Sequence, residues 1–247
     1  MITKTKDSLK WLEFELFQDL KALSHAIFLR SGGTSFPPYD SLNMGFSTDD
    51  NQECLKKNLD KALSVFKASR YQRGRLVHGN TVLEASDAKE ALSDGLMTSE
   101  KDLALIITHA DCQAAILYDP IHHALSAVHA GWRGQKANIY KEAVQAMQRR
   151  YGSKPQDLLV GVSPSLGPKH AEFKDWETLL PASFAKFRIG ACHFDFWAVA
   201  EDQFLELGIL KHHLEIAKIC TFEENESFFS HRRDKITGRN ATFAALR

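Results

Sequence analysis

The most informative segment of the chain is residues 107–134, ITHADCQAAILYDPIHHALSAVHAGWRG. Two apolar, β-prone runs flank the group Asp119-Pro120-Ile121-His122, which is typical of a turn. We therefore predict an antiparallel hairpin whose centre lies between Pro120 and Ile121. In that register Cys112 faces His129 on the same side of the ribbon, with Cβ atoms roughly 4.5–5.5 Å apart. That separation suits two side chains that bind one metal ion.

Hydrophobic periodicity predicts further elements on both sides of this hairpin. Helices are expected over residues 55–66 and 137–151, and after Asp195, which is typical of a helix N-cap. The predicted strands are Ala26–Leu29, Arg75–Val77, Leu103–Thr108, Ala114–Tyr118, Ala124–His129, Leu158–Val162 and Phe228–His231. Strands and helices alternate without a regular βαβ rhythm, and no Pro/Gly/Ser-rich linker divides the chain. The expected fold is α/β with mixed α+β character, a layered sandwich of mixed β-sheet with covering helices, in one domain over residues 1–247.

Composition and charge exclude several classes of protein. The 247 residues are 44% hydrophobic, and 31 basic residues balance 31 acidic ones, so bulk electrostatic attraction to nucleic acid or to an anionic membrane is not expected. The longest apolar run, Leu103–Ile107, is too short to span a membrane, and the first residues do not resemble a signal peptide. The four cysteines form no CxxC pair and are expected to be reduced thiols. We expect a soluble, cytoplasmic protein.

A third ligand-type residue, His78, follows a predicted strand and precedes a glycine that permits a turn. Its separation from Cys112 and His129 excludes a zinc-finger knuckle, whose ligands lie a few residues apart. Two histidines and one cysteine from distant segments are typical of an open catalytic zinc site, with the fourth position left for water or substrate. Copper is the alternative metal. A structural site with His109 as fourth ligand also stays open, as does a cluster that binds no metal.

Other chemistries compete with this interpretation. Cys112 could be the nucleophile of a cysteine hydrolase, with His129 as its base. A zinc-stabilised interaction domain is the non-enzyme alternative. The sequence His170-Ala171-Glu172 matches the HxE of nucleobase deaminases, but no CxxC follows it. The chain has 11 histidines and no His-x-His pair, which argues against a multicopper oxidase.

The order of the motifs resembles one known family. His78-Gly79, Asp94–Thr98 (DGLMT), Ala110-Asp111-Cys112 and His129–Gly134 (HAGWRG) are similar to motifs of the laccase-domain or YfiH-like family, also described as purine nucleoside phosphorylases of the multicopper-polyphenol-oxidoreductase type. Further similar segments are Arg30–Ser35, Ser41-Leu42-Asn43, Ser163–Pro168, Ser230–Asp234 and Thr237-Gly238-Arg239. The resemblance covers roughly residues 25–247. His170–Phe173 departs from the family's usual C/H-Y-E-V.

The resemblance implies a metal, zinc, bound by His78, Cys112 and His129, and a fold akin to cysteine-hydrolase-like domains. It implies a purine nucleoside and phosphate as small-molecule partners, with phosphorolysis of adenosine, inosine and methylthioadenosine, together with adenosine deamination. Polyphenol oxidation with copper and amide hydrolysis of peptidoglycan precursors are the other activities that the family suggests.

Within this framework several residues are candidates for substrate chemistry. Asp111, next to Cys112, is a candidate general acid or base. Phosphate needs fixed donors, and arginine side chains supply them. The candidate substrate-binding residues are Arg30, Asn43, Arg133 and Arg239. Trp132 or Phe46 is a candidate to stack on the purine, with core packing as the alternative fate of each.

Overall fold

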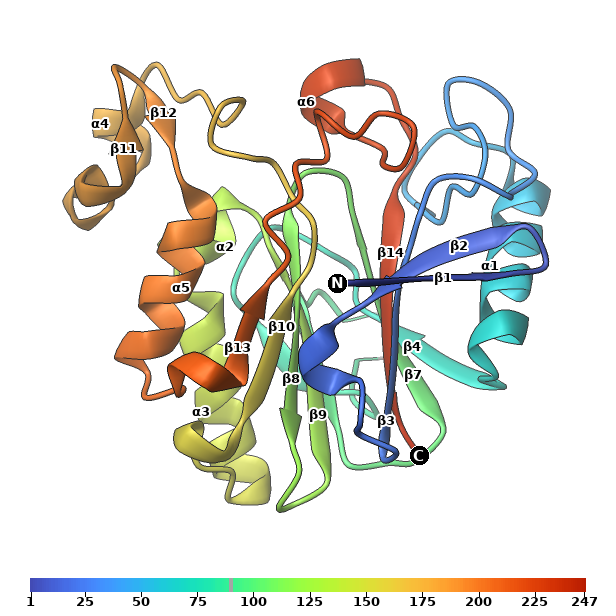
Figure 1. Cartoon of the computed structure of the whole chain (residues 1–247), viewed down its shortest axis with the longest axis horizontal. Coiled ribbons are helices and arrows are strands. Elements are labelled where there is room, and N and C mark those ends of the chain that lie inside the picture. The colour runs from blue at the N-terminus through green and yellow to red at the C-terminus, as the bar shows by residue number, and fades with distance from the viewer. Residues whose placement is uncertain (89–90) are drawn as a thin grey trace.

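Two six-stranded β-sheets face each other, and helices cover their outer faces (Figure 1). The computed structural model describes residues 1–88 and 91–247. The first sheet contains, in order, β1 (Ile2–Lys6), β2 (Leu9–Glu13), β3 (Leu23–Phe28), β14 (Asn240–Leu246), β7 (Leu103–His109) and β4 (Arg70–Arg73). The second contains β13 (Leu214–Ile216), β10 (Leu159–Val162), β8 (Gln113–Asp119), β9 (Ala124–Ala130), β6 (Gly95–Thr98) and β5 (Val82–Glu84). Each sheet mixes parallel and antiparallel pairs, so the predicted mixed, layered architecture is confirmed.

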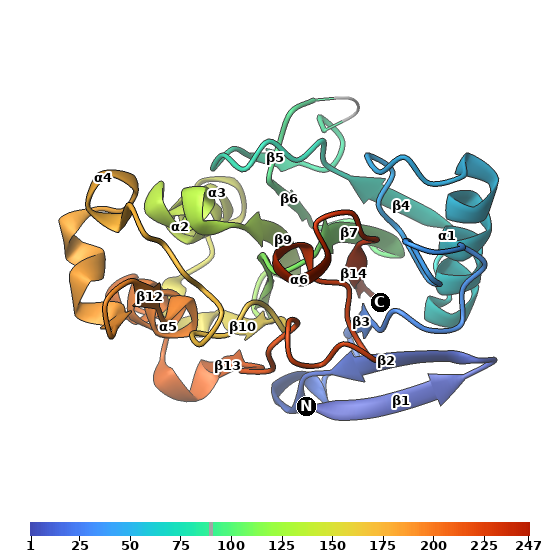
Figure 2. The same ribbon diagram turned by 90° about the horizontal axis from the view of Figure 1, so that it is seen from above.

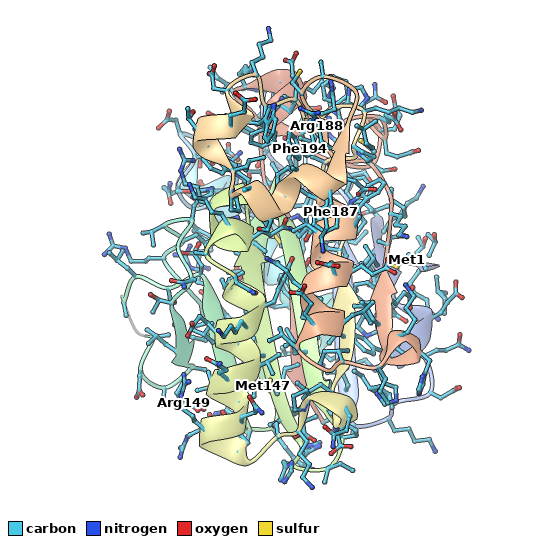
Figure 3. The ribbon with its side chains drawn as sticks, turned by 90° about the vertical axis from the view of Figure 1, so that its left-hand side faces the viewer. Met1, Met147, Arg149, Phe187, Arg188 and Phe194 are labelled. Carbon is cyan, nitrogen blue, oxygen red and sulfur yellow. The ribbon has the colours of Figure 1, made fainter. Side chains whose placement is uncertain are left out.

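The helices lie outside the sheets. Helix α1 (Gln52–Phe66) covers the first sheet, whereas α2 (Trp132–Lys136), α3 (Ile139–Tyr151) and α5 (Phe196–Glu206) cover the second (Figures 2 and 3). The remaining elements are α4 (Trp176–Leu179), α6 (His231–Asp234), the small pair β11 (Arg188–Ile189) and β12 (His193–Phe194), and 3₁₀ turns at Glu15–Phe17, Pro155–Asp157, Ala182–Phe187 and Lys211–His213. In the described ranges 1–88 and 91–247, no helix combines the length and apolar content that a membrane crossing needs.

Local sequence explains where the predicted helices begin and end. The Asp195 carboxylate accepts N–H groups of Trp197 and Ala198 at the start of α5, which confirms Asp195 as an N-cap. Helix α3 ends at Gly152, whose φ of 77° lies in the left-handed region that favours glycine.

The core consists of three apolar layers, because the central strands are buried on both faces. In β8, Ile116 points toward the opposing sheet while Leu117 points toward the helices. In β14, Ala244 packs between the sheets and Phe243 packs beneath α1. Burial on both faces is why these strands have near-continuous apolar sequences instead of an alternating pattern.

The predicted hairpin is confirmed, but its register is different. Residues 120–123 form a four-residue turn, and His129 pairs with Ala114 instead of Cys112. The cause is Asp119, which stays in the strand while its Oδ1 accepts the N–H groups of Ile121 and His122. The register moves by two positions, so the side chains predicted to share a face still do.

Two predicted strands are wrong. Phe228 and Phe229 are buried in a loop, and His231 begins α6. Side chains satisfy the backbone of this loop, because Asn240 bonds both polar groups of Phe229 and Arg233 donates to the Phe228 carbonyl. The predicted strand Arg75–Val77 reduces to one bridge from Arg75 to Leu92.

Candidate metal centre

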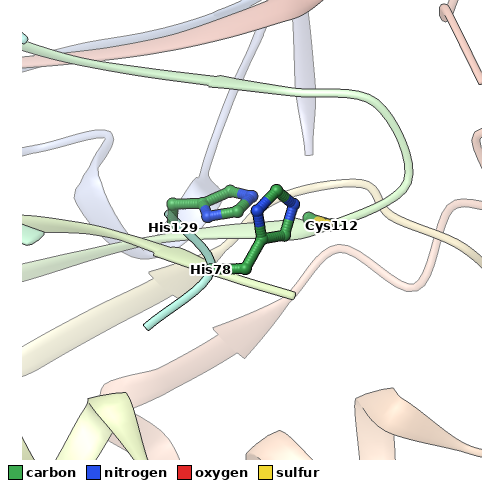
Figure 4. A group of neighbouring side chains, drawn as sticks. All are labelled: His78, Cys112 and His129. Carbon is green, nitrogen blue, oxygen red and sulfur yellow. The ribbon is translucent and has the colours of Figure 1, made fainter. Parts of the chain in front are cut away.

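Three loop and strand ends bring His78, Cys112 and His129 together (Figure 4). One ligand atom from each residue lies within 4.8 Å of the others. The two imidazole rings stand nearly perpendicular, with centroids 4.9 Å apart. His129 ends β9, Cys112 lies just before β8, and His78 lies in the loop between β4 and β5. Residues that the sequence separates widely therefore share one end of the second sheet.

The fully buried carboxylate of Asp94 positions both histidines. Its Oδ1 lies 3.0 Å from His129 Nδ1 and accepts the backbone N–H of His78 at 2.8 Å. Its Oδ2 accepts the backbone N–H groups of Gly79 at 2.7 Å and Val77 at 3.2 Å. The segment donates its N–H groups to a carboxylate instead of to a neighbouring strand, which explains why the predicted strand there is not formed.

The backbone around the cluster is held in a restricted conformation at His78 and is closely packed at Gly131. His78 has a φ of 60°, a left-handed conformation that the Asp94 bonds hold in place. A Cβ atom at Gly131 would lie 3.0 Å from Cys112 Sγ and 3.2 Å from His78 Cδ2. Glycine at position 131 is therefore needed for the thiol and the imidazole to approach each other.

Electrostatics favour a charged pair within the cluster. Burial raises the pKa of the Cys112 thiol, but His129 and then His78 outweigh burial and lower that pKa to about 6. Burial lowers the pKa of His129, whereas Cys112 and Asp94 raise it, and the net pKa is about 9. Burial also raises the pKa of Asp94, but its bonds to His129 and to the 77–79 backbone bring that pKa below its usual value. The lowered pKa of the thiol favours the thiolate form of Cys112.

These residues fit a transition-metal ion. His129 Nδ1 is occupied by Asp94, which leaves Nε2 for a ligand, the carboxylate–histidine arrangement common in zinc proteins. The lowered thiol pKa favours the thiolate that metals bind. His109 does not join the cluster, because its Nε2 lies 2.9 Å from Thr242 Oγ1 in the core. Among residues 1–88 and 91–247, three candidate protein ligands, not four, therefore meet here.

A cavity of about 320 Å³ opens beside the cluster. Its wall combines two residues of the cluster, His78 and Cys112, with aromatic side chains and with residues from α2, α5 and α6. The lining residues are His78, Ala110, Asp111, Cys112, Gln113, Ala130, Gly131, Trp132, Arg133, Gln135, Ser165, Leu166, Phe173, Phe196, His231 and Arg232. A cavity of this size, lined by aromatic and by several polar side chains, is large enough for a small-molecule site.

One predicted substrate-binding residue, Arg133, and the candidate acid or base, Asp111, line this cavity. Arg133 is exposed, and its guanidinium lies 4.1 Å from the centre of the Trp132 ring. Asp111 has a φ of 82°, and its carboxylate accepts Thr221 Oγ1 at 2.8 Å and the Arg232 N–H at 2.5 Å. Asp111 therefore ties the end of β7 to α6.

The other three predicted substrate residues are not brought to the cavity wall. The Arg30 guanidinium donates to the carbonyls of Asp40 and Asn225. Asn43 is fully buried, and its Oδ1 accepts the backbone N–H groups of Gly45 and Arg239. The Arg239 side chain donates to carbonyls of its own turn. Their polar atoms organise loops instead.

Of the two aromatic candidates for stacking, one reaches the cavity. Trp132 lines it, whereas Phe46 packs under the Arg73 guanidinium, 3.8 Å from ring centre to Cζ, in a separate groove.

Sequence reasoning missed the residues that complete the site. Asp94 begins the DGLMT motif of residues 94–98, but only the folded structure shows that its carboxylate contacts His129. Phe173 and Phe196 form an aromatic wall with Trp132. Their rings belong to an apolar cluster around α4 and α5 that is separate from the three core layers. No spacing in the sequence marks aromatic residues of this kind as cavity lining.

The chain is a layered α/β protein with a candidate metal centre at one end of its second sheet. Comparisons with known proteins identify its family. A family model described as "Multi-copper polyphenol oxidoreductase laccase" matches residues 24–247. The chain belongs to this family.

Individual relatives match along nearly the whole chain. A Bacteroides thetaiotaomicron protein named purine nucleoside phosphorylase is 31% identical, with 94% of both chains covered. Purine nucleoside phosphorylase YfiH of Escherichia coli K12 is 30% identical, with 88% of this chain and 91% of the relative covered. The crystal structure of hypothetical protein YfiH of Bacillus licheniformis has a TM-score of 0.88 at 26% identity and covers 99% of both chains. YlmD from Geobacillus stearothermophilus has the same TM-score and identity, with 100% of this chain and 99% of that one covered.

Proposed function

We propose that the protein is a zinc-dependent purine nucleoside phosphorylase with adenosine deaminase activity. The observation that carries the proposal is one cavity that combines a His₂Cys cluster, an aromatic wall and exposed arginine. Relatives named purine nucleoside phosphorylase, 30% and 31% identical over most of the chain, support this choice of reaction. Adenosine, inosine and methylthioadenosine are the proposed nucleosides, with phosphate as second substrate.

In this proposal the chain's own residues divide the work. Trp132, Phe173 and Phe196 supply flat apolar surface for the purine base. Arg133, exposed at the cavity, binds the phosphate that attacks C1′ of the ribose. His231 lines the same cavity and donates a proton to the purine as the glycosidic bond breaks.

His78, Cys112 and His129 would hold the metal, with Asp94 bonded to the His129 imidazole and to the His78 backbone N–H. A zinc ion in such a site supplies Lewis-acid chemistry and lowers the pKa of water. Asp111 accepts hydrogen bonds on both of its carboxylate oxygens. Asp111 therefore holds α6, which carries His231, against the cavity.

The test is product analysis with protein of known metal content. Zinc-loaded protein is incubated with adenosine, with and without phosphate, and adenine, inosine and hypoxanthine are separated by chromatography. We expect phosphate-dependent release of adenine and phosphate-independent formation of inosine. Absence of phosphate-dependent base release from adenosine, inosine and methylthioadenosine alike would overturn the phosphorylase assignment.

A second candidate function is amide hydrolysis, including hydrolysis of peptidoglycan precursors, with Cys112 as nucleophile. The observation in its favour is the lowered pKa of Cys112 beside His129, an arrangement that also activates cysteine nucleophiles. The two functions respond differently to metal removal. Amide hydrolysis with Cys112 as nucleophile should survive exhaustive chelation and be lost on alkylation of Cys112. Phosphorolysis, in our proposal, is lost on chelation and returns when zinc is added.

A further inference from the structure

A second group of ligand-type side chains lies outside the cluster already described. His170, Cys220 and Glu223 each offer one atom within 4.8 Å of the other two. None of the three lines the cavity beside Cys112. We propose that these residues form a second binding site for a divalent transition metal of the zinc class. A nitrogen, a sulfur and a carboxylate oxygen are all accepted zinc ligands.

The position of the sulfur is set by its surroundings. Cys220 is buried, and its backbone bridges to Ser165. The Gly167 N–H donates to Cys220 Sγ at 3.2 Å, which fixes the position of the sulfur. A Cβ atom at Gly167 would lie 3.0 Å from this sulfur. The chain therefore leaves room for Sγ where two turns meet and supplies a hydrogen bond to it.

The imidazole and the carboxylate are also in place. The His170 ring stacks on Phe222, with centroids 3.9 Å apart and planes inclined by 13°. His170 Nε2 lies 3.3 Å from Glu223 Oε1. Tetrahedral zinc with bonds of about 2.0–2.3 Å separates neighbouring ligand atoms by roughly 3.3–3.8 Å. The nitrogen–oxygen distance already lies in that range, so binding needs only small side-chain movement.

One cation competes for the same carboxylate. Lys169 Nζ lies 3.8 Å from Glu223 Oε1, but the lysine side chain is 81% exposed. It can move into water at little cost, because exposed ion pairs contribute little free energy. Removing its charge is therefore expected to strengthen metal binding at this site alone.

The site would act as a clamp behind the cavity wall. Ser165 and Leu166, which line the cavity, directly precede Gly167. On the other side of the site, Thr221 Oγ1 donates to Asp111. A metal bound between these two turns would fix both segments relative to each other, and its role is structural support of the proposed nucleoside site.

The experiment is a count of zinc per chain in the full-length protein. Chelator-stripped protein is dialysed against buffered zinc, and bound zinc is measured by mass spectrometry. We expect two zinc ions in the wild-type protein and one in each of His170→Ala, Glu223→Gln and Cys220→Ser. Cys112→Ala should also retain one, and Cys112→Ala combined with His170→Ala should retain none. Cys192→Ser, a change at a cysteine outside both groups, should retain two.

Competition titration with a chromophoric chelator sharpens the result. Lys169→Ala should bind the second zinc several-fold more tightly, with the first unchanged. His170 and Glu223 are partly exposed, so their variants are expected to fold, and melting curves of the metal-free proteins check this. The proposal is overturned if wild-type protein binds a single zinc that Cys112→Ala removes, or if folded His170→Ala still binds two. Neither result depends on which reaction the cavity supports.

Discussion

The two ends of the β8–β9 hairpin each carry an aspartate–histidine pair, yet only one end forms a candidate site. At the open end, Asp94 Oδ1 lies 3.0 Å from His129 Nδ1. At the turn, Asp119 Oδ2 lies 2.8 Å from His122 Nδ1. Both aspartates are fully buried and accept backbone N–H groups as well. The local bonding of the two pairs is therefore nearly the same.

What differs is the other side of each imidazole. At His129 it faces a thiol and a second imidazole. At His122 the ring is 35% exposed, and Nε2 lies 3.7 Å from where a Cβ of Gly152 would be. Among residues 1–88 and 91–247, His122 belongs to no group of three ligand-type side chains. Convergence of a third and fourth group, not the buried pair itself, makes the candidate site.

The largest expected effect follows from removing that convergence. Cys112→Ala and His129→Ala should each lose the first metal and lower phosphorolysis about a thousandfold, equivalent to about 4 kcal/mol of transition-state stabilisation. His122→Ala, at the turn, should change turnover less than twofold. Zinc content and initial rates of base release are the measurements, and full turnover in either variant of the first pair would contradict the assignment.

Replacing each aspartate with asparagine tests whether Asp94 positions the candidate ligands. Asp94→Asn should weaken zinc affinity by about 10–100-fold, the usual consequence of losing the carboxylate behind a ligating histidine. Asp119→Asn is the matched control, because it breaks the same kind of bond at the other end. It should lower the melting temperature and leave zinc affinity unchanged. Equal zinc affinities for the two variants would show that Asp94 does not position the ligands.

A histidine buried without a carboxylate sharpens the comparison through pH. Burial lowers the pKa of His25 to about 4, and its Nε2 accepts the Phe14 N–H at 2.7 Å. Because the unfolded chain takes up this proton near pH 6.5, the contribution of neutral His25 is present above that pH and is lost as pH falls toward 4. Between pH 7 and 5 the loss is about 2 kcal/mol. In urea unfolding, the free energy of unfolding of His25→Gln should fall by about 2 kcal/mol less than that of the wild-type protein between pH 7 and 5. The same pH dependence in both proteins would contradict the assignment of a neutral, buried His25.

The smallest expected effect is on phosphate binding by Arg133 and Arg30, which the sequence predicts as equivalent candidates. Arg133→Ala should raise KM for phosphate about tenfold, about 1.4 kcal/mol, with kcat little changed. Arg30→Ala should leave that KM unchanged and lower the melting temperature, because Arg30 donates to loop carbonyls. Steady-state kinetics at varied phosphate distinguish the two. A rise in KM for phosphate in Arg30→Ala alone would reverse our placement of the phosphate.

Much of the fold was predictable because it follows from local periodicity. The helix that ends at Gly152 and the strands of the central hairpin depend on residues near in sequence. The register was not predictable, because one side-chain oxygen of Asp119 determines the length of the turn. The buried run at Phe228 resembles a strand, but contacts from Asn240 and Arg233 make it a loop.

The convergence of the candidate metal ligands was predictable for a different reason. A cysteine and two histidines stand out by chemical type and by the glycines beside them. Asp94 and Phe173 do not, since aspartate and phenylalanine are common and only the folded chain places them against His129 and Trp132. Arg30 and Asn43 do not line the cavity, because their polar groups bond to loop backbone.

The most direct test of the central claim is anomalous diffraction at the zinc edge from crystals of zinc-loaded His170→Ala protein. We expect one strong peak, about 2.3 Å from Cys112 Sγ and about 2.0–2.1 Å from a ring nitrogen of each of His78 and His129. A zinc-loaded crystal in which the peak lies elsewhere, or in which any of these three side chains turns away from the ion, would contradict this expectation.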